Sequence, residues 1–221
     1  MFLPILTAVC GVVVIILTRA SKTTENFSST SSITATTSTT TAISYRWNAT
    51  AKTIAGIVGS SGNGSSQLNN PYGLVVDSSG AVYVADSANN RVQKWIIGAS
   101  SGTTVAGQAD GTNSFGPSYL FNPTDVLVDS NGTVYAADTG YQRIQRWTNG
   151  SSSGTTVAGT GTFGPATDQL YNPYGLAWDP SSGALYIADE SNDRIVQYLP
   201  GATNGTVVAG GNGRGINVSS Q

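Results

Sequence analysis

The feature that most constrains this chain is a sequence block that occurs three times. The block NPYGLVVDSSGAVYVADSANNRVQKW covers residues 70–95, and similar blocks cover residues 122–147 and 172–198. A second phrase, TTVAG or TVVAG, follows the blocks at residues 103–107, 155–159 and 206–210. The copies lie about 51 residues apart, and a repeat of that length forms one supersecondary unit that stacks on its neighbours. The chain is therefore expected to fold as an array of similar units.

Each unit contains four short runs with the composition of β-strands. In the first unit these runs are separated by Gly, Asn, Asp and Ser clusters and cover residues 73–77, 81–86, 91–95 and 103–106. Apolar, β-branched and aromatic runs between such clusters are typical of strands joined by tight turns. Asn131-Gly132 in the second unit is a strong hairpin signal, and no helical periodicity is present. The pattern predicts an all-β fold of propeller blades, each a four-stranded antiparallel sheet.

The repeated motif resembles that of a known family. Its parts are Pro-x-Gly-Leu-x-x-Asp, Gly-x-x-Tyr-x-Ala-Asp and Asn-x-Arg-[Val/Ile]-Gln, and the resemblance to NHL-repeat β-propellers covers roughly residues 70–210. It implies six-bladed closed rings in which the first strand of each repeat is nearest the axis. The second copy departs from the motif, with Thr124-Asp125 in place of Tyr-Gly and 140–142 in place of the Asn-containing turn. We expect both departures to lie at turns.

The repeats divide the segment 45–221 into an incomplete ring of about three and a half blades. A partial unit, with strands expected at 43–47 and 53–56, precedes three full ones, which gives a half blade at 45–66 and blades at 67–117, 118–167 and 168–214. A six-bladed ring would need about two and a half further units. Repeat arrays need capped ends. We therefore expect the open blade faces to make self-association possible.

The amino-terminal part lacks the repeat and consists of an apolar segment followed by a Ser/Thr-rich segment. Residues 1–20 carry an uninterrupted apolar run at 2–18, followed by Arg19. This run is predicted to be an apolar helix acting as a signal-anchor or a cleaved signal peptide, with a buried core strand as a third alternative. Residues 21–44 are rich in Ser and Thr, which make up 16 of the 24 residues, and cannot bury enough apolar surface to fold. They are expected to form a disordered stalk, either O-glycosylated or an unmodified linker.

The sequence also bears on the side of the membrane. Candidate N-glycosylation sequons occur, in modest excess over chance, at Asn26, Asn48, Asn63, Asn131, Asn149, Asn204 and Asn217. Several of them are Asn-Gly, which suits turns for structural reasons alone. The single cysteine, Cys10, lies in the apolar run, so no disulfide is expected in the folded part. These features favour a propeller anchored through the amino-terminal segment and displayed extracellularly, or a secreted one.

Composition argues against several kinds of chemistry. The chain has no His, which removes the commonest general base and zinc ligand. The peptidyl-hydroxyglycine amidating lyases are an enzyme class with a similar NHL-type architecture. They rely on metal-binding His, a role that no residue of this chain can take. No metal or cofactor is expected. Ten scattered basic residues and a net charge of −2 give no phosphate-binding face, so nucleic acid is not an expected partner. A cytoplasmic ubiquitin-ligase or RNA-binding relative would also need a zinc-binding module.

An Asp and an Arg recur five residues apart in every full unit. The positions are Asp86 and Arg91, Asp138 and Arg143, and Asp189 and Arg194. These pairs could be interpreted as catalytic groups, but a residue needed by every blade is better explained as ordering the turn and linking strands. An Asp can accept backbone N–H groups, and the Arg guanidinium can reach carboxylates or carbonyls. We therefore assign these pairs a structural role.

Residues that differ between the units are the better candidates for binding. The long connections 108–122 and 160–172 carry Asp110, Tyr119, Phe121, Asp168 and Tyr171. Aromatic residues on loops suit protein or glycan contacts. The phrase Phe-Gly-Pro recurs at 115–117 and 163–165, which indicates a packing role for it. The expected function is non-enzymatic binding of a protein or glycan through loops on one face. The alternative is a fragment of a propeller lyase or hydrolase whose catalytic groups lie in missing blades.

Overall fold

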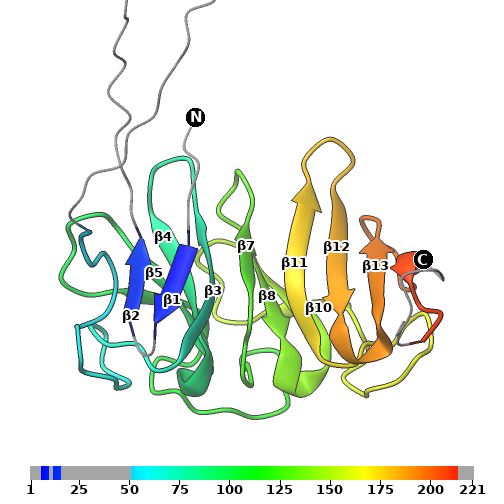
Figure 1. Ribbon diagram of the computed structural model, residues 1–221, viewed down its shortest axis with the longest axis horizontal. Helices are drawn as coiled ribbons and strands as arrows, with labels where there is room; N and C mark the ends of the chain where they lie inside the picture. Colours follow the sequence, from blue (N-terminus) through cyan, green and yellow to red (C-terminus); the bar gives the residue numbers. More distant parts are fainter. Residues whose placement is uncertain (1–5, 10–11, 16–50, 214–221) are drawn as a thin grey trace, which may run out of the picture.

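The computed structural model describes residues 6–9, 12–15 and 51–213, with side-chain detail for the last range. Three four-stranded antiparallel sheets form the framework of this part of the chain and stand side by side in Figure 1. Blade 1 contains β3 (Pro71–Val76), β4 (Val82–Asp86), β5 (Arg91–Trp95) and β6 (Thr103–Gly107). Blade 2 contains β7 (Val126–Val128), β8 (Val134–Asp138), β9 (Arg143–Trp147) and β10 (Thr155–Ala158). Blade 3 contains β11 (Pro173–Asp179), β12 (Ala184–Asp189), β13 (Arg194–Tyr198) and β14 (Thr206–Gly210).

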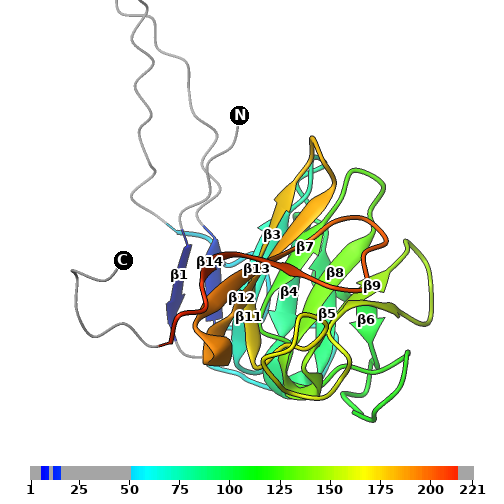
Figure 2. The ribbon, with the colours of Figure 1, turned by 90° about the vertical axis from the view of Figure 1, so that its right-hand side faces the viewer.

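The strands of each blade pair in sequence order, as the all-β prediction requires. The first strands, β3, β7 and β11, lie next to one another, so they form the inner edge of the arc and β6, β10 and β14 the outer edge. Viewed from the blade 3 side, the sheets lie one behind another (Figure 2). The described part of the chain is thus an incomplete propeller of three blades.

The turn after each inner strand is organised by an aspartate. Asp77 Oδ1 accepts the backbone N–H groups of Ser79 and Ala81, both at 2.9 Å. Asp129 makes the same pair of bonds to Asn131 and Thr133, also at 2.9 Å. An aspartate at this position replaces the missing backbone partners of a tight turn, which explains why every unit carries one.

A short 3-10 turn joins the second and third strands of each blade: η1 (Ser87–Asn89), η2 (Thr139–Tyr141) and η3 (Glu190–Asn192). The residue that ends it is left-handed, with φ of 54° at Asn90 and 52° at Gln142. Asn tolerates this conformation better than Gln does. In both blades, however, the side-chain oxygen accepts an N–H from the next blade, from Asn122 at 3.0 Å or Asn172 at 2.6 Å. Gln142 therefore preserves the link that Asn90 makes, and this departure from the motif does lie at a turn.

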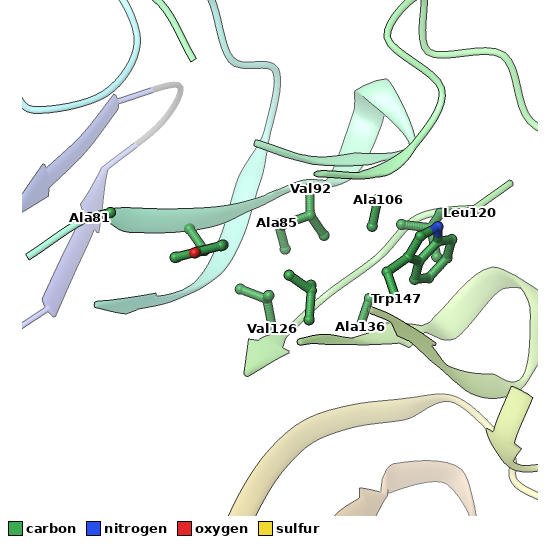
Figure 3. Packing of buried hydrophobic residues seen from close by; sticks show 10 residues of the cluster. Ala81, Ala85, Val92, Ala106, Leu120, Val126, Ala136 and Trp147 are labelled. Atoms are coloured by element: carbon green, nitrogen blue, oxygen red, sulfur yellow. The ribbon is translucent and has the colours of Figure 1, made fainter. Parts of the chain in front are cut away.

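The core lies between the blades. One cluster joins blades 1 and 2 (Figure 3) and contains Tyr83, Val92, Leu120, Val134 and Trp147. An equivalent cluster joins blades 2 and 3. Side chains alternate between the two faces of a strand, so Val82 and Val84 point the other way, into a third cluster with Trp95 and Leu68. Blades 1 and 2 therefore bury both of their faces, whereas blade 3 buries only the face that packs on blade 2 among the described residues.

The aromatic residue that ends each third strand packs on a glycine. A Cβ at Gly102 would lie 2.8 Å from the Trp95 ring, and one at Gly154 would lie 2.9 Å from the Trp147 ring. Gly102 and Gly154 also donate their N–H groups to Ser65 and Pro117 in the preceding connection, at 2.8 Å and 2.7 Å. This close approach ties the outer half of each blade to the loop before it.

The partial unit before blade 1 lies only partly within the described residues. Residues 43–47 lie outside the described part, and 53–56 form no strand there, although Ala55 is buried in the cluster beside Leu68. The segment therefore contributes apolar side chains to the face of blade 1 without joining a four-stranded sheet among the described residues. Its neighbours Ile57 and Ser60 form only an isolated bridge.

The amino-terminal segment is described in two short pieces, β1 (Leu6–Val9) and β2 (Val12–Ile15), which pair with each other. The rest of the predicted leader 1–20 and the whole stalk 21–44 lie outside the described residues. No helix in the described ranges combines the length and the apolar composition that crossing a bilayer requires.

Candidate functional site

Three kinds of segment meet at one end of the arc, the lower end in Figure 1. They are the connections from each outer strand to the next blade, the 3-10 turns, and the first residues of the inner strands. The opposite end carries the short turns after the first and third strands. All five predicted binding residues lie in the connections between blades, and so at the lower end. We call this end the loop face.

The Asp–Arg pairs lie just beneath the loop face. Arg91 Nε is 2.8 Å from Asp86 Oδ2, and the equivalent distances in blades 2 and 3 are both 2.7 Å. The second oxygen of Asp86 accepts the N–H of Asn69 at 2.7 Å, and Asp138 and Asp189 bind Phe121 and Tyr171 in the same way. Each carboxylate therefore joins the 3-10 turn to the connection entering its own blade.

Each guanidinium binds backbone carbonyls of that same connection. Arg91 donates to Asn63, Gly64 and Gln67, and also to Ala109 in the following connection. Arg143 donates to Gly116 and Tyr119 at 2.8 Å and 3.2 Å. Burial raises the pKa of Asp138 to about 6 despite its arginine partner. Because all these bonds end on the chain itself, the geometry gives the pairs the function of holding the loops.

The predicted binding residues are divided between exposed and anchored positions. Asp110 is exposed and accepts the backbone N–H of Thr112 at 2.9 Å. Tyr119 and Asp168 are half-buried, and the Tyr119 carbonyl is one of those held by Arg143. Phe121 and Tyr171 are 37% and 39% exposed. The structure therefore brings Phe121 and Tyr171 to the surface, while Tyr119 belongs partly to the loop framework.

Two aromatic clusters project from the connections. Phe115 meets Tyr141 edge-on at 5.4 Å, and Phe121 lies 5.4 Å from the same ring. In the next connection Phe163 lies 5.1 Å from Tyr171. Phe115 and Phe163 nevertheless stay 63% and 62% exposed. The Phe-Gly-Pro phrase therefore does pack, as its recurrence indicated, but it leaves most of each Phe ring facing solvent.

A third aromatic contact lies at the inner edge of the loop face, where the sequence predicted no site. Tyr72 is the second residue of β3 and Tyr174 the second residue of β11, and their rings meet edge-on at 5.8 Å although blade 2 stands between the two strands. Both rings remain exposed, at 41% and 42%. Blade 2 has Thr124 at the equivalent position, with its hydroxyl bonded 2.9 Å from the Tyr174 carbonyl. A small residue there leaves the two tyrosines room to meet.

The next residue, Asp125, connects all three blades. Its Oδ2 accepts the N–H of Leu176 in blade 3 at 2.8 Å, and its Oδ1 lies where a Cβ on Gly73 of blade 1 would be. Gly73 N–H also donates to the Thr124 carbonyl at 2.8 Å. Burial raises the pKa of Asp125, partly offset by the backbone donors Leu176 and Val126.

The expectation that Thr124-Asp125 lies at a turn was wrong. Thr124 and Asp125 bond to the backbone of Ala137 in β8 and lead directly into β7, so they form the inner edge of blade 2. The available signal was the departure itself. Thr124 and Asp125 break a motif that the other two copies keep. Residues that differ between the blades are the better candidates for function, so both could have been chosen on that ground.

The described residues hold no group of three or more His, Cys, Asp or Glu that could hold a metal ion. Four sequons are within the described part, and all four asparagines, Asn63, Asn131, Asn149 and Asn204, are exposed. The last three lie on turns at the end opposite the loop face. Asn26, Asn48 and Asn217 lie outside the described residues.

Comparison with known proteins agrees with this architecture. Residues 68–95 match the family model of the NHL repeat. This segment is an NHL repeat. The resemblance of the repeated motif to NHL propellers is thereby confirmed, and the matched segment runs from Leu68 through β5 of blade 1. No curated protein matches the chain in sequence.

Solved structures share the fold of the NHL-repeat segment. A nidogen/laminin complex matches with a TM-score of 0.50 and 24% identity, covering 64% of this chain and 49% of that one. An auxiliary nutrient binding protein from Bacteroides thetaiotaomicron matches with a TM-score of 0.50 and 15% identity, covering 66% and 37%. A streptogramin B lyase matches at 0.40 and 16%, covering 62% and 39%. The chain thus spans about half or less of the length of these structures, and the likeness concerns the fold.

Proposed function

We propose that this NHL-repeat propeller is a non-enzymatic binding module that holds a protein partner on its loop face, displayed on the extracellular side of a membrane. One observation carries the proposal: large aromatic side chains stay exposed while their backbone is fixed. Phe115 and Phe163 are more than 60% exposed, yet their connections are held by buried Arg143 and by Arg194. Rigid, exposed aromatic rings are typical hot spots of protein interfaces because they bury much area with little loss of entropy.

The enzymatic alternative has less support in the described part. Its buried carboxylates, Asp86, Asp138 and Asp189, are each paired with an arginine. A general acid or base has to reach a substrate proton, whereas the oxygens of these groups bind the backbone of their own loops. A binding protein and an enzyme both occur among the solved structures of this fold. The loop-face geometry therefore decides our choice.

The extracellular display rests on the distribution of the sequons. Asn131, Asn149 and Asn204 are exposed at the end opposite the loop face. Glycans there would leave the aromatic clusters clear. The apolar leader and the Ser/Thr-rich stretch that follows it suit a membrane tether. If the ligand is a glycan and not a protein, we propose that it binds at the same loop face.

A binding screen with matched variants tests the function. The purified chain is applied to arrays of extracellular proteins and of glycans, next to Phe115→Ser/Phe163→Ser and Ile97→Ser. Ile97 is 50% exposed on a turn at the opposite end. We expect protein partners that bind the wild type and Ile97→Ser but lose at least tenfold in affinity with the double variant. Partners that bind all three forms equally would exclude the loop face, and turnover of a bound molecule would favour the enzyme.

Display on the extracellular side has its own test. Expressed in a eukaryotic cell, the protein should lose mass on enzymatic deglycosylation, and the loss should shrink stepwise as Asn131, Asn149 and Asn204 are changed to Gln. Protection of the repeats from external protease, together with no mass change, would place the propeller in the cytosol.

A further inference from the structure

We propose that the inner edge of the loop face, at Tyr72, Asp125, Tyr174 and Glu190, binds a cationic side chain, a guanidinium or ammonium, presented by the protein partner. This inference rests on the proposed binding function and names the chemistry of one contact. It is carried by a carboxylate that lacks the arginine partner of the three fully buried aspartates, and by a pair of aromatic rings that have no cation over them among the described residues.

Asp125 is the first of these groups. Asp86, Asp138 and Asp189 are buried and each has an Arg within 2.8 Å. The half-buried aspartates Asp77, Asp129 and Asp179 bind donors of their own turns, and only Asp77 has a base, Lys94, at 3.9 Å. Asp125 is half-buried too, but within the described part it forms no ion pair and accepts only backbone N–H groups, from Val126 and Leu176. Removing a carboxylate from water without a counter-charge is costly. A cation from a partner would offset that cost.

The tyrosine rings are the second group. Elsewhere the chain places its own cations over rings: Lys94 lies 4.9 Å from the Tyr83 centroid, and Arg143 lies 4.9 Å from that of Phe115. Tyr72 and Tyr174 have no such cation among the described residues, although about two fifths of each side chain is exposed. Edge-to-face rings each leave a face free, and an aromatic face attracts a cation through its negative quadrupole.

The backbone segments that carry these groups lie next to one another. The carboxylate of Asp125 lies against Gly73, the neighbour of Tyr72, and bonds to Leu176, two residues from Tyr174. Burial, the Tyr72 hydroxyl and the negative charge of Glu190 raise the pKa of Tyr174 to about 12, so Tyr174 carries no charge of its own at neutral pH. Glu190 donates its backbone N–H to the Asn172 carbonyl at 3.3 Å, just before β11, and is exposed, and no ion pair involves it among the described residues. The site therefore offers aromatic ring faces and two carboxylates, and neither carboxylate is paired with a Lys or Arg among the described residues.

The repeats indicate that this arrangement is particular to blade 2. A regular copy of the motif would place Tyr at Thr124 and Gly at Asp125. Tyr at the first position would occupy the space in which Tyr72 and Tyr174 meet, and Gly at the second would remove the negative charge. Thr124 leaves room for the ring pair, and Asp125 supplies the carboxylate. A blade that only had to repeat its neighbours would carry neither substitution.

The test uses the full chain in a nonionic detergent, labelled with ring-¹³C tyrosine and observed by NMR. Signals are assigned with Tyr72→Phe and Tyr174→Phe, and acetyl-Gly-Arg-Gly-amide is titrated beside acetyl-Gly-Glu-Gly-amide. We expect the arginine peptide to shift the signals of Tyr72 and Tyr174 with millimolar affinity, and the glutamate peptide to leave them unchanged. Asp125→Asn keeps an oxygen for the Leu176 N–H and should weaken binding at least fivefold.

Two further variants separate the site from general electrostatics and from the wider function. Glu190→Gln, at an exposed position that does not threaten folding, should weaken the arginine peptide two- to fivefold. Asp129→Asn makes the same charge change on a turn at the opposite end, keeps an oxygen for the N–H groups of Asn131 and Thr133, and should have an effect below twofold. Equal losses in Asp125→Asn and Asp129→Asn, or no response of the two tyrosines, would overturn the inference. Protein binding in the array screen could still persist, so the two proposals fail separately.

Discussion

Asp86 and Arg91, five residues apart, form an ion pair of 2.8 Å in which neither side chain is more than 1% exposed. Every oxygen and nitrogen of the pair is used, since the carboxylate also binds Asn69 and Asn89 and the guanidinium binds four carbonyls. Buried charges are tolerated only when they are fully paired in this way. The pair converts two flexible loops into a fixed rim, and its equivalents do so in the other blades.

The first prediction concerns Arg143, the equivalent residue of blade 2. Arg143→Ala leaves Asp138 buried without its counter-charge and the carbonyls of Gly116 and Tyr119 without a donor. We expect the free energy of unfolding to fall by about 1–3 kcal/mol, measured by chemical denaturation. Lys94→Ala, which removes a half-exposed ion pair of 3.9 Å, should cost less than about 1 kcal/mol. An unchanged midpoint for Arg143→Ala would contradict a structural role.

The second prediction compares two glycines at the same motif position. A Cβ on Gly73 would lie 2.7 Å from the Cα of Asp125 and 2.8 Å from the Thr124 carbonyl oxygen, whereas one on Gly175 would meet only the Ala188 Cβ at 3.7 Å. Gly73→Ala should therefore lower the melting temperature clearly and Gly175→Ala should be tolerated. Asp125→Gly removes the carboxylate oxygen nearest to the added Cβ but leaves the two backbone atoms in place, so it should rescue Gly73→Ala only in part. Equal melting temperatures for the two single variants would refute this packing.

The third prediction separates the hydrogen bond of Asp125 from its charge. Asp125→Ala removes the acceptor of the Leu176 N–H and should cost about 1–3 kcal/mol of stability. Asp125→Asn retains an acceptor oxygen and removes a charge that burial disfavours, so its stability should lie within about 1 kcal/mol of the wild type. Denaturation curves for both variants decide the matter. A larger loss in Asp125→Asn than in Asp125→Ala would mean that the charge itself holds the blades together.

The fourth prediction is a pH dependence from Asp138. Its pKa is about 6 in the folded chain against 3.8 for the ordinary carboxyl, so between these values the folded state keeps a proton that the unfolded state has released. The contribution of this group to stability is then complete below pH 3.8, falls as the pH rises to 6, and is constant above. A shift of two units corresponds to about 3 kcal/mol. Asp138→Asn should remove this part of the slope, and parallel profiles for the two proteins would count against it.

The fifth prediction concerns the outer face of blade 3. Val92 and Ile144 are fully buried between blades, whereas Ile195, at the same position of blade 3, is 36% exposed, and Val208 is 47% exposed. Uncovered apolar surface costs about 25 cal/mol per Å2, so we expect the segment 45–221 to self-associate through this face. Ile195→Lys/Val208→Lys should lower the mass found by light scattering, and Ile97→Lys should not. A wild-type segment that stays monomeric at high concentration would refute the expectation.

The sequence by itself determined the blades. Strand number, turn positions and the Asp–Arg spacing are all visible within one repeat, because each depends on alternation, on tight turns and on bonds between residues less than one unit apart. The antiparallel order of β3 to β6 and the burial of Val92 and Trp95 follow from that local information.

Only the tertiary structure decided what the inner edge contains. Asp125 and Leu176 are 51 residues apart, and Tyr72 and Tyr174 belong to different blades, so their contacts depend on how the blades stack. The sequence showed that Thr124-Asp125 broke the motif, but the space that a small Thr leaves, and the carboxylate held against Gly73, arise only when three inner strands converge. The meeting of the three inner strands depends on how the blades are arranged in the arc, and the sequence of one repeat does not specify it.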